Sequence, residues 1–505
     1  MNRGVTGRGK WPLEVYFYLV ALCWVFAAPL ASLGFFAKAN KDSIADYTVV
    51  QRWGLAAAII AAVSLTVIVI AGYSARRVAP YLASLAFMFF SMSWAPATTG
   101  LRIMLWIVVS FLLGSIVLSA VGTSSAAFTG VAALLVVGAV YLHWPLLQKT
   151  ESVITPVTSN TLSISPNVYI LMVDGFGSPR VLTEQLDAEE GELDVLLASL
   201  AQLGLELESD AHASFAETTL SIGSMLAGQP LYVDGEGVSA ARRIGLATLG
   251  GESTFVAWFK ANGYRYLHYG PSSFDASSCR SATIDLCLSK ASGASVEVSE
   301  AIRSLTPIST MWSRSQPVAS ELATVASSAL AFTRAQPVLT YVHVLSPHPP
   351  YTLDERCEPL DEPVGSVSSG WEAGLQSLYV GQAVCLLQQL VEFAHSIVAA
   401  DPSAIVIVQG DHGPAFGVDW TMGLQEWSDA QLAQRFEVLR LTRLPDQCKS
   451  SAMEAQLVIN TLALLQSCLT GEEPLWIPWQ PYLTYYGGEG IESVPLERQL
   501  TAIDR

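Results

Sequence analysis

Residues 167–177 read Asn-Val-Tyr-Ile-Leu-Met-Val-Asp-Gly-Phe-Gly. The six residues from Val168 to Val173 are apolar or aromatic without alternation, which is typical of a strand buried on both faces. Such a strand belongs to a parallel sheet that helices cover on both sides. Asp174 follows the strand directly, and Gly175 allows the chain to turn there. Because reactive groups gather at the carboxyl ends of the strands in an open α/β sheet, Asp174 is a candidate site residue.

Further short apolar runs alternate with helical stretches downstream. The predicted strands are Val338–Leu345, Ala404–Val408, Phe436–Leu441 and Tyr264–Tyr269, and the predicted helices are Leu193–Leu203, Glu252–Asn262, Leu375–Ala399 and Ala452–Leu469. This alternation predicts an α/β domain with a parallel sheet. Residues 145–166 are polar, rich in Ser and Thr and without helical periodicity, so they are interpreted as a linker ahead of that domain.

Two more of the predicted strands lead into carboxylates and imidazoles. One runs into Gln-Gly-Asp-His-Gly, which contains Asp411 and His412. Another contains His343 and leads to Pro-His-Pro-Pro, in which His348 stands between prolines. Carboxylates and imidazoles are the ligands of a hard to borderline divalent cation. The alternatives are an ordinary turn at the Asp-containing segments and, for the strand histidine, a buried and hydrogen-bonded structural role.

A threonine stands where a helix is expected to begin. Thr218 lies in the segment Ser214–Thr219, directly before the apolar run Leu220–Leu226. A hydroxyl at a helix start faces unpaired amides and the positive end of the helix dipole, where an alkoxide is favoured and a phosphate is attracted. Coordination to a metal would lower the pKa of the hydroxyl further and make it a nucleophile. The alternative is a plain N-cap, because threonine is also a preferred capping residue.

The first 150 residues have a different composition from the rest of the chain. They carry a net charge of +7, against −24 for residues 151–505, and they hold five apolar runs. Each run is close to the roughly 20 residues that a helix needs to cross a bilayer. The runs are Pro12–Ala37, Gly54–Tyr73, Pro80–Ala95, Leu101–Val121 and Ala126–His143.

Basic residues in the short loops predict the orientation of these spans. Three of them precede the first run, and Arg76 and Arg77 follow the second, which places the N-terminus in the cytoplasm. Lys38, Lys41 and Arg52 in the first outer loop favour the opposite orientation. With the N-terminus inside, five spans deliver residue 151 onward to the outside.

Cysteine usage agrees with an outer location. Six of the seven cysteines follow residue 151, and an even number in an oxidising compartment suggests disulfides. Cys279 and Cys287 are near enough in sequence to close a small loop, with buried free thiols as the alternative. No Cys-x-x-Cys occurs, so a structural zinc site is not expected. The surplus of acid argues against nucleic acid as a partner.

The order of strand–Asp, Thr at a helix start, Pro-His-Pro-Pro-Tyr and Gly-Asp-His-Gly resembles the alkaline phosphatase superfamily. In particular it is similar to the membrane-bound branch of sulfatase-like hydrolases and transferases, which includes lipoteichoic acid synthases and lipid A phosphoethanolamine transferases. The resemblance covers about residues 167–469. It implies an α-helical membrane domain of about five spans at 1–144, the linker at 145–166, and an extracytoplasmic α/β domain of alkaline phosphatase-like fold at 167–505.

The resemblance also implies roles for individual residues. The side chains that would bind a divalent metal ion, zinc or manganese, are Asp174, Thr218, Asp411 and His412. Thr218 would also be the covalent nucleophile, with Thr219 as the second choice. His343 and His348 would bind the phosphate or assist the leaving group.

The chain departs from the patterns of the families it resembles at two places. Phosphoethanolamine transferases have Gly-Glu-Thr where this chain has Asp174-Gly175. True sulfatases need Cys or Ser in a Cys/Ser-x-Pro-x-Arg motif, but the segment Cys-Glu-Pro-Leu-Asp that begins at Cys357 ends in Asp, so sulfate-ester hydrolysis is not expected. His212 and His268 match no role in the family.

The expected activity is metal-dependent transfer of phosphoethanolamine or phosphoglycerol from a phospholipid to an envelope glycan or lipid, through a phospho-threonine. The expected location is the inner membrane of a Gram-negative bacterium, with a cytoplasmic N-terminus and a periplasmic catalytic domain. Two alternatives are a phosphodiesterase or phosphatase that uses water, and a non-catalytic membrane scaffold of the same fold.

Overall fold

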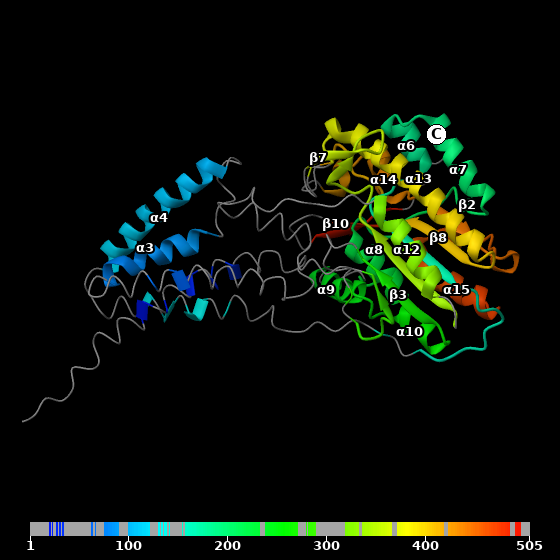
Figure 1. Cartoon of the computed structure of the whole chain (residues 1–505), viewed down its shortest axis with the longest axis horizontal. Coiled ribbons are helices and arrows are strands. Elements are labelled where there is room, and N and C mark those ends of the chain that lie inside the picture. The colour runs from blue at the N-terminus through cyan, green and yellow to red at the C-terminus, as the bar shows by residue number, and fades with distance from the viewer. Residues whose placement is uncertain are drawn as a thin grey trace, which may run out of the picture. The chain divides into compact units, whose positions relative to one another are not determined.

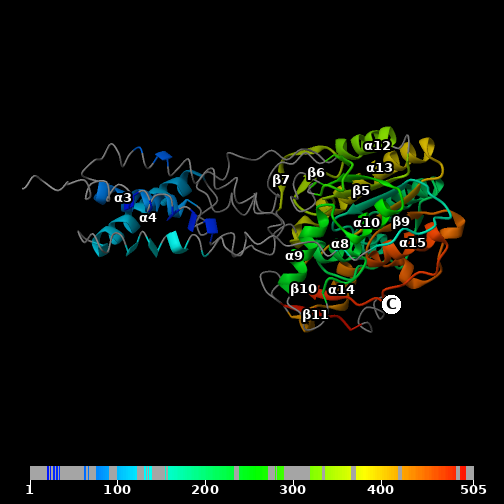
Figure 2. The ribbon, with the colours of Figure 1, turned by 90° about the horizontal axis from the view of Figure 1, so that it is seen from below.

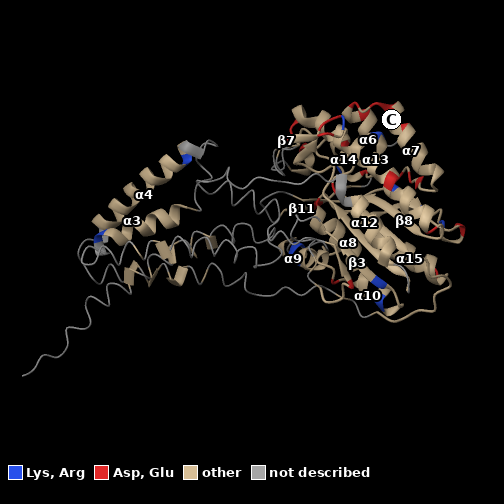
Figure 3. Ribbon diagram, viewed as in Figure 1, with Lys and Arg blue, Asp and Glu red and all other residues tan. Residues whose placement is uncertain are grey.

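The computed structural model describes residues 75–89 and 99–121 of the first 150 residues continuously, with isolated positions besides. In the rest of the chain it describes residues 154, 157–232, 238–270, 279, 281–288, 319–332, 336–365, 371–418, 423–484 and 490–495. The described residues fall into two compact units, and the boundary between them in the sequence lies near residue 150 (Figure 1). In the first unit the described charged side chains are Arg77 and Arg102, whereas acidic side chains are spread over the second unit (Figure 3).

The described part of the first unit contains a pair of packed helices, α3 (Ala75–Met88) and α4 (Thr99–Val121). Their backbones approach closely at Gly114, where an added Cβ would lie 2.9 Å from the Cα of Tyr81. The segment Leu101–Ser119 of α4 is long and apolar enough to cross a membrane.

Two of the five predicted spans fall on these helices. The run at 101–121 corresponds to α4, and the run at 80–95 overlaps α3, which begins earlier, at Ala75. The runs at 12–37, 54–73 and 126–143 lie outside the continuously described residues, so the number of five spans stays a prediction. Among the described helices, only one other, Ala373–Ala400, is long and apolar enough to span, and it is half buried in the second unit.

The second unit is built on a seven-stranded sheet in the order β2-β9-β8-β1-β5-β3-β4 (Figure 1). The strands are β1 (Val168–Val173), β2 (Glu206–Leu207), β3 (Arg265–Tyr269), β4 (Leu286–Cys287), β5 (Val338–Val344), β8 (Ile405–Gly410) and β9 (Arg440–Arg443). The central strand β1 runs parallel to β5 and β8, and Val173 lies opposite Val344 and Gly410. The three strands therefore end at the same edge of the sheet, and the residues that follow them meet there.

Helices cover both faces of the sheet, as the continuous apolar runs predict. The helices are α6 (Pro179–Leu186), α7 (Glu190–Gln202), α8 (Thr218–Ala227), α9 (Val238–Leu249), α10 (Thr254–Ala261), α12 (Ala319–Phe332), α13 (Gln376–Ala400), α14 (Asp429–Phe436) and α15 (Thr461–Thr470). Tyr169, Leu171 and Val173 of β1 pack into one core with α6, α7, α12 and α13. On the opposite face Gln409 of β8 contacts Met225 of α8, and Figure 2 shows α8, α10 and α15 on that side.

Two predicted elements differ in the structure. The run at 436–441 was expected to be a strand of a parallel sheet, but Phe436 ends α14 and β9 begins only at Arg440, antiparallel to β8. Val438 and Leu439 are apolar because the connection between helix and strand is itself buried. The helix expected at 452–469 begins only at Thr461, after short 3₁₀ turns. One carbonyl in those turns, that of Ala455, accepts a hydrogen bond from the buried Arg440 guanidinium in place of a helical amide.

Smaller elements complete the second unit. Two hairpins are formed by β6 (Tyr351–Leu353) with β7 (Pro359–Val364), and by β10 (Tyr482–Thr484) with β11 (Ile491–Ser493). The disulfide predicted between Cys279 and Cys287 is confirmed. The other four cysteines of this unit form the disulfides Cys357–Cys385 and Cys448–Cys468.

Candidate active site

Three predicted metal ligands meet at the carboxyl edge of the sheet. Asp174 follows β1 and Asp411 follows β8, and the pairing of the two strands places them side by side. His412 Nε2 lies 3.7 Å from Asp174 Oδ1 and 3.4 Å from Asp411 Oδ2. One ligand atom from each of the three side chains lies within 4.8 Å of the others, and all three residues are buried.

The backbone fixes the Asp411 carboxylate so that one oxygen remains available. Oδ1 of Asp411 accepts hydrogen bonds from the amides of Gly175 at 3.0 Å and His412 at 2.9 Å. Oδ2 is buried and has no hydrogen-bond partner among the described residues. The sharp turn after His412 requires Gly413, because a Cβ there would lie 2.0 Å from the carbonyl oxygen of Gln434. An orphaned carboxylate oxygen beside a second carboxylate and an imidazole fits a divalent cation.

The electrostatics of the cluster favour the same interpretation. Burial, and then the negative charge of Asp174, raise the pKa of Asp411 to about 7. Burial also acts to raise the pKa of Asp174, but the charge of His348 and the contact with His343 outweigh it and hold that pKa well below its usual range. The pair thus tends to share one proton near neutral pH. A bound cation would take the place of that proton, since ligands bind metal in the deprotonated form.

Hydrogen bonds to backbone carbonyls set the tautomers of two histidines. Nδ1 of His412 lies 3.0 Å from the carbonyl oxygen of Gly413, and Nδ1 of His348 lies 2.7 Å from that of Pro349. A carbonyl oxygen only accepts, so each Nδ1 carries a hydrogen, and Nε2 of a neutral His412 ring presents a lone pair. Burial, followed by the charge of Arg435, holds the pKa of His412 well below its usual value. His412 is therefore neutral, as a metal ligand must be.

Thr218 is the first residue of α8, and its hydroxyl points into the cluster. Oγ1 lies 3.1 Å from His412 Nε2, and 3.4 and 3.5 Å from the two carboxylate oxygens of Asp174. The N-cap position belongs to Glu217, so the alternative of a plain threonine cap does not hold. Thr219 is turned toward α9, where a Cβ added to Gly245 would lie 2.9 Å from its methyl carbon. Of the two threonines, Thr218 is thus the one that lies beside the carboxylates.

The two predicted phosphate-binding histidines also adjoin Asp174. His343 of β5 is buried, and its Nε2 lies 3.3 Å from Asp174 Oδ2. The backbone amide of His348 donates to the carbonyl of Asp174 at 3.0 Å, and its ring centroid lies 6.2 Å from that of His412.

The two histidines without a family role occupy other places. The ring centroid of His212 lies 4.3 Å from that of Trp479 near the C-terminal end of the described chain. His268 of β3 is buried, and its Nδ1 lies 2.6 Å from the hydroxyl of Tyr266.

Several supporting residues were missed by the sequence reasoning. The buried guanidinium of Arg435 donates to the carbonyls of Ala216 at 2.8 Å and Gly413 at 2.6 Å, so it joins the loop before Thr218 to the loop after His412. Ser221 Oγ donates to the carbonyl of Asp411 at 2.6 Å. The three-residue spacing from Thr218 to Ser221, one helical turn, could have indicated Ser221, whereas nothing in the sequence marks Arg435.

A hydroxyl at a helix start, beside buried carboxylates and an imidazole at the carboxyl edge of an α/β sheet, defines an enzyme of the alkaline phosphatase superfamily. The chain belongs to the sulfatase family, because the family model described as Sulfatase matches residues 166–450. Comparison with curated proteins finds no match.

Three similar solved structures are two phosphoethanolamine transferases and one lipoteichoic acid synthase. Phosphoethanolamine transferase EptA from Neisseria meningitidis is 10% identical, with 90% of this chain and 95% of that chain covered and a TM-score of 0.43. The zinc complex of the periplasmic domain of EptC from Escherichia coli is 14% identical, with 63% and 87% covered and a TM-score of 0.40. Lipoteichoic acid synthase LtaP from Listeria monocytogenes is 13% identical, with 63% and 77% covered and a TM-score of 0.40. The family assignment rests on the family model.

True sulfatases convert the Cys or Ser of their motif to formylglycine, and membership of the family does not imply that this chain does so. Cys357, which begins the partial motif in the sequence, is bonded to Cys385 and is not available for that modification. The residue beside the candidate metal ligands is a threonine.

Proposed function

We propose that this enzyme transfers a phospho-headgroup from a phospholipid to an envelope glycan or lipid through a phosphoester on Thr218. The observation that carries the proposal is the position of Thr218 Oγ1, 3.1 Å from His412 Nε2 and 3.4 Å from Asp174 Oδ1, at the N-terminus of α8. A helix N-terminus stabilises negative charge on the hydroxyl oxygen and on a bound phosphate.

In the first step the Thr218 hydroxyl loses its proton and its oxygen attacks the phosphorus of the lipid. The bond from phosphorus to the diacylglycerol oxygen breaks, and that oxygen takes up a proton. In the second step an acceptor hydroxyl loses its proton and attacks the same phosphorus, which returns Thr218 to its hydroxyl form. His343 and His348 would contact the phosphoryl oxygens or the leaving oxygen, since both adjoin Asp174.

The residues that would hold a divalent ion, zinc or manganese, are Asp174, Thr218, Asp411 and His412. When bound, the ion supplies Lewis acidity toward the phosphoryl group and toward the attacking oxygen. The orphaned Oδ2 of Asp411 supports this assignment, because a buried carboxylate oxygen is costly to leave without a partner.

The choice of a lipid donor follows from the organisation of the chain. An apolar helix, α4, precedes the catalytic unit and is long enough to span a bilayer. Three disulfides in the catalytic unit support an oxidising compartment, and hence a periplasmic domain anchored in a bacterial inner membrane, with the N-terminus in the cytoplasm. The proposed headgroups are phosphoethanolamine and phosphoglycerol.

The test is intact-mass analysis of the full chain in detergent after incubation with zinc or manganese and bacterial phospholipid. The wild type is expected to gain the mass of one phospho-headgroup, and Thr218→Ala is expected to gain nothing. The matched control is Thr219→Val, which removes the neighbouring hydroxyl but keeps the methyl group against α9. Absence of the adduct from metal-bound wild type would contradict the covalent route, and release of free headgroup alone would indicate hydrolysis.

A further inference from the structure

Three buried side chains on α13 each contact a different part of the chain near the site. They are Tyr379, Gln382 and Cys385, spaced three residues apart, and residues at this spacing are neighbours on a helix surface. All three are at most 2% exposed. They are called the α13 stripe below.

Tyr379 holds the turn that follows Asp174. Its hydroxyl donates to the carbonyl of Gly175 at 2.8 Å and accepts from the amide of Gly177 at 3.1 Å. Gly175 has a φ of 73°, in the region that favours glycine, so the chain reverses direction between these two bonds. One phenol group therefore clasps both sides of the turn that places the Asp174 carboxylate.

Gln382 holds the loop that carries His348. Its Oε1 accepts from the amide of Thr352 at 2.8 Å, and its Nε2 donates to the carbonyl of Pro347 at 3.3 Å. These two backbone groups stand on either side of His348 in the chain. The loop is joined to the first one as well, since the His348 amide donates to the carbonyl of Asp174.

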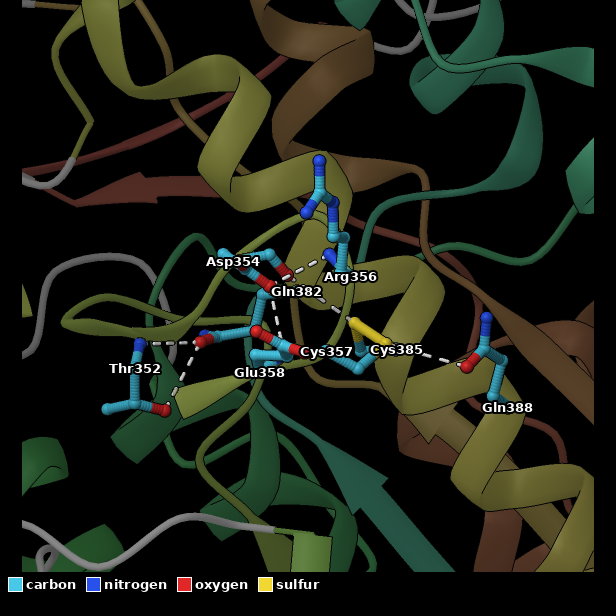
Figure 4. Close-up of a disulfide and its surroundings, with 8 residues drawn as sticks. All are labelled: Thr352, Asp354, Arg356, Cys357, Glu358, Gln382, Cys385 and Gln388. Atoms are coloured by element: carbon cyan, nitrogen blue, oxygen red, sulfur yellow. Dashed lines mark hydrogen bonds between the residues drawn. A yellow bond between two sulfur atoms is a disulfide. The ribbon is translucent and has the colours of Figure 1, made fainter. Parts of the chain in front are cut away.

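Cys385 ties down the hairpin that continues from this loop. Figure 4 shows its disulfide with Cys357, which lies in the turn between β6 and β7. The disulfide lies close to the hydrogen bond between Gln382 and Thr352. Asp354 shapes the turn, because its Oδ1 accepts from the amides of Arg356 at 2.8 Å and Glu358 at 2.9 Å. The hairpin lies against the helix, where a Cβ on Gly381 would be 3.0 Å from the Cα of Glu355. The disulfide thus keeps Thr352 within reach of Gln382.

We propose that the α13 stripe positions the two loops that carry Asp174 and His348, and that the Cys357–Cys385 disulfide is needed for activity as well as for stability. The inference rests on the proposed function, because it takes its meaning from the roles of Asp174 and His348. Tyr379, Gln382 and the disulfide are positioning groups, since they act through backbone atoms of the loops and not on substrate. The chain would then reach full activity only after export to an oxidising compartment.

The first test replaces the two hydrogen-bonding members in the full chain purified in detergent. Gln382→Ala is expected to lower kcat by roughly 10- to 100-fold and to shift the imidazole NMR signals of His348, while zinc affinity stays close to wild type. Tyr379→Phe is expected to weaken zinc binding by a similar factor of about 10 to 100, because the Asp174 turn is no longer clasped.

The chain offers matched controls for both changes. Gln389 lies seven residues further along the same helix, and its Oε1 has no hydrogen-bond partner among the described residues, so Gln389→Ala is expected to leave kcat unchanged. The Tyr169 hydroxyl is equally buried and lacks such a partner in the described part of the chain, so Tyr169→Phe is expected to leave zinc affinity unchanged.

The second test compares two disulfides. The pairs Cys357–Cys385 and Cys448–Cys468 are 28 and 20 residues apart, so their removal restores a similar amount of chain entropy to the unfolded state. Double alanine substitution of either pair is expected to lower the melting temperature by a similar amount. Only removal of Cys357–Cys385 is expected to lower kcat, by about 10-fold or more, and to shift the His348 signals.

The proposal is overturned if Gln382→Ala, Tyr379→Phe and loss of Cys357–Cys385 leave kcat, zinc affinity and the His348 signals as in their controls. Should Gln382→Ala not fold, Gln382→Glu gives the same test, since it keeps the acceptor for Thr352 and loses the donor to Pro347. If wild type forms no adduct on Thr218, the proposed function fails. Zinc titration and the His348 signals still test whether the α13 stripe positions the two loops, because neither measurement depends on turnover.

Discussion

Replacing Asp411 with asparagine is expected to stabilise the metal-free protein above pH 7 and at the same time to remove its affinity for metal. The asparagine Oδ1 can keep the two hydrogen bonds from the amides of Gly175 and His412. Its amide nitrogen takes the place of the orphaned Oδ2 and presents a donor to the neighbouring carboxylate of Asp174. The exchange removes a repulsive negative charge without changing the shape of the side chain.

The magnitude follows from the pKa of Asp411. That pKa is about 7 in the folded protein against an ordinary value of 3.8, because burial and the charge of Asp174 disfavour ionisation. One pKa unit corresponds to about 1.4 kcal/mol, so the ionised side chain costs the metal-free protein on the order of 4 kcal/mol above pH 7.

The sign of the pH dependence distinguishes the groups of the cluster. Between pH 3.8 and about 7 the folded state holds the Asp411 proton more tightly than the unfolded state, so this group makes stability fall as pH rises. The pKa of Asp174 is depressed, so its contribution is present above pH 3.8 and is lost as pH falls below that value. Burial lowers the pKa of His412, whose contribution is complete above pH 6.5 and is lost at lower pH. Only the difference in stability between wild type and Asp411→Asn, followed as a function of pH, isolates the contribution of Asp411.

The assay is thermal unfolding of the full chain in detergent at several pH values, with and without zinc. Without metal, Asp411→Asn is expected to melt several degrees above wild type at pH 8, and the two should converge toward pH 4. Zinc at about a thousand times its dissociation constant stabilises a binding-competent protein by about 4 kcal/mol. Wild type should show this increase and the variant should not. A variant that melts below wild type at pH 8 without metal, or that binds zinc equally well, would refute the reasoning.

Further predictions concern the residues that shape the site. Gly413→Ala is expected to prevent folding of the catalytic unit, because its Cβ would lie 2.0 Å from the carbonyl oxygen of Gln434; recovery of normally folded protein would contradict this. Arg435→Met is expected to destabilise the protein by about 1–3 kcal/mol, because the buried carbonyl of Ala216 loses its donor while that of Gly413 keeps His412; denaturant unfolding measures this, and an unchanged midpoint would contradict it. Ser221→Ala removes the hydrogen bond from α8 to the carbonyl of Asp411 and is expected to lower kcat by about 10-fold with substrate KM nearly unchanged. A change confined to KM would contradict that role.

The sequence predicts those parts of the fold that depend on local pattern. Strands β1, β3, β5 and β8 lie within a residue or two of their predicted bounds, because each is buried on both faces and so is mostly apolar or aromatic. The same reasoning misplaced the start of β9, since the connection after α14 also buries apolar side chains, at Val438 and Leu439. The residues of such a run do not indicate whether the strand pairs in parallel or antiparallel, so the antiparallel direction of β9 was not predictable.

The site residues also fall into those that the local sequence pattern predicts and those that only tertiary packing reveals. Asp174 and Asp411 follow two neighbouring strands that run parallel, so the topology brings them together once the strands are assigned. Gln382 and Tyr379 reach the site from a helix, and Tyr379 lies about 200 residues along the chain from the turn it clasps. On an amphipathic helix such polar residues look like a solvated face, and only tertiary packing distinguishes them.

The most direct test of the central claim is to locate the headgroup on the chain. Wild-type protein is incubated with metal and phospholipid, quenched in acid, digested, and sequenced by tandem mass spectrometry. The covalent mechanism predicts a phospho-headgroup on Thr218, in the peptide that contains the start of α8, and its loss on addition of an acceptor. A headgroup on another residue, or lipid consumed by metal-bound enzyme with Thr218 never modified, would contradict it.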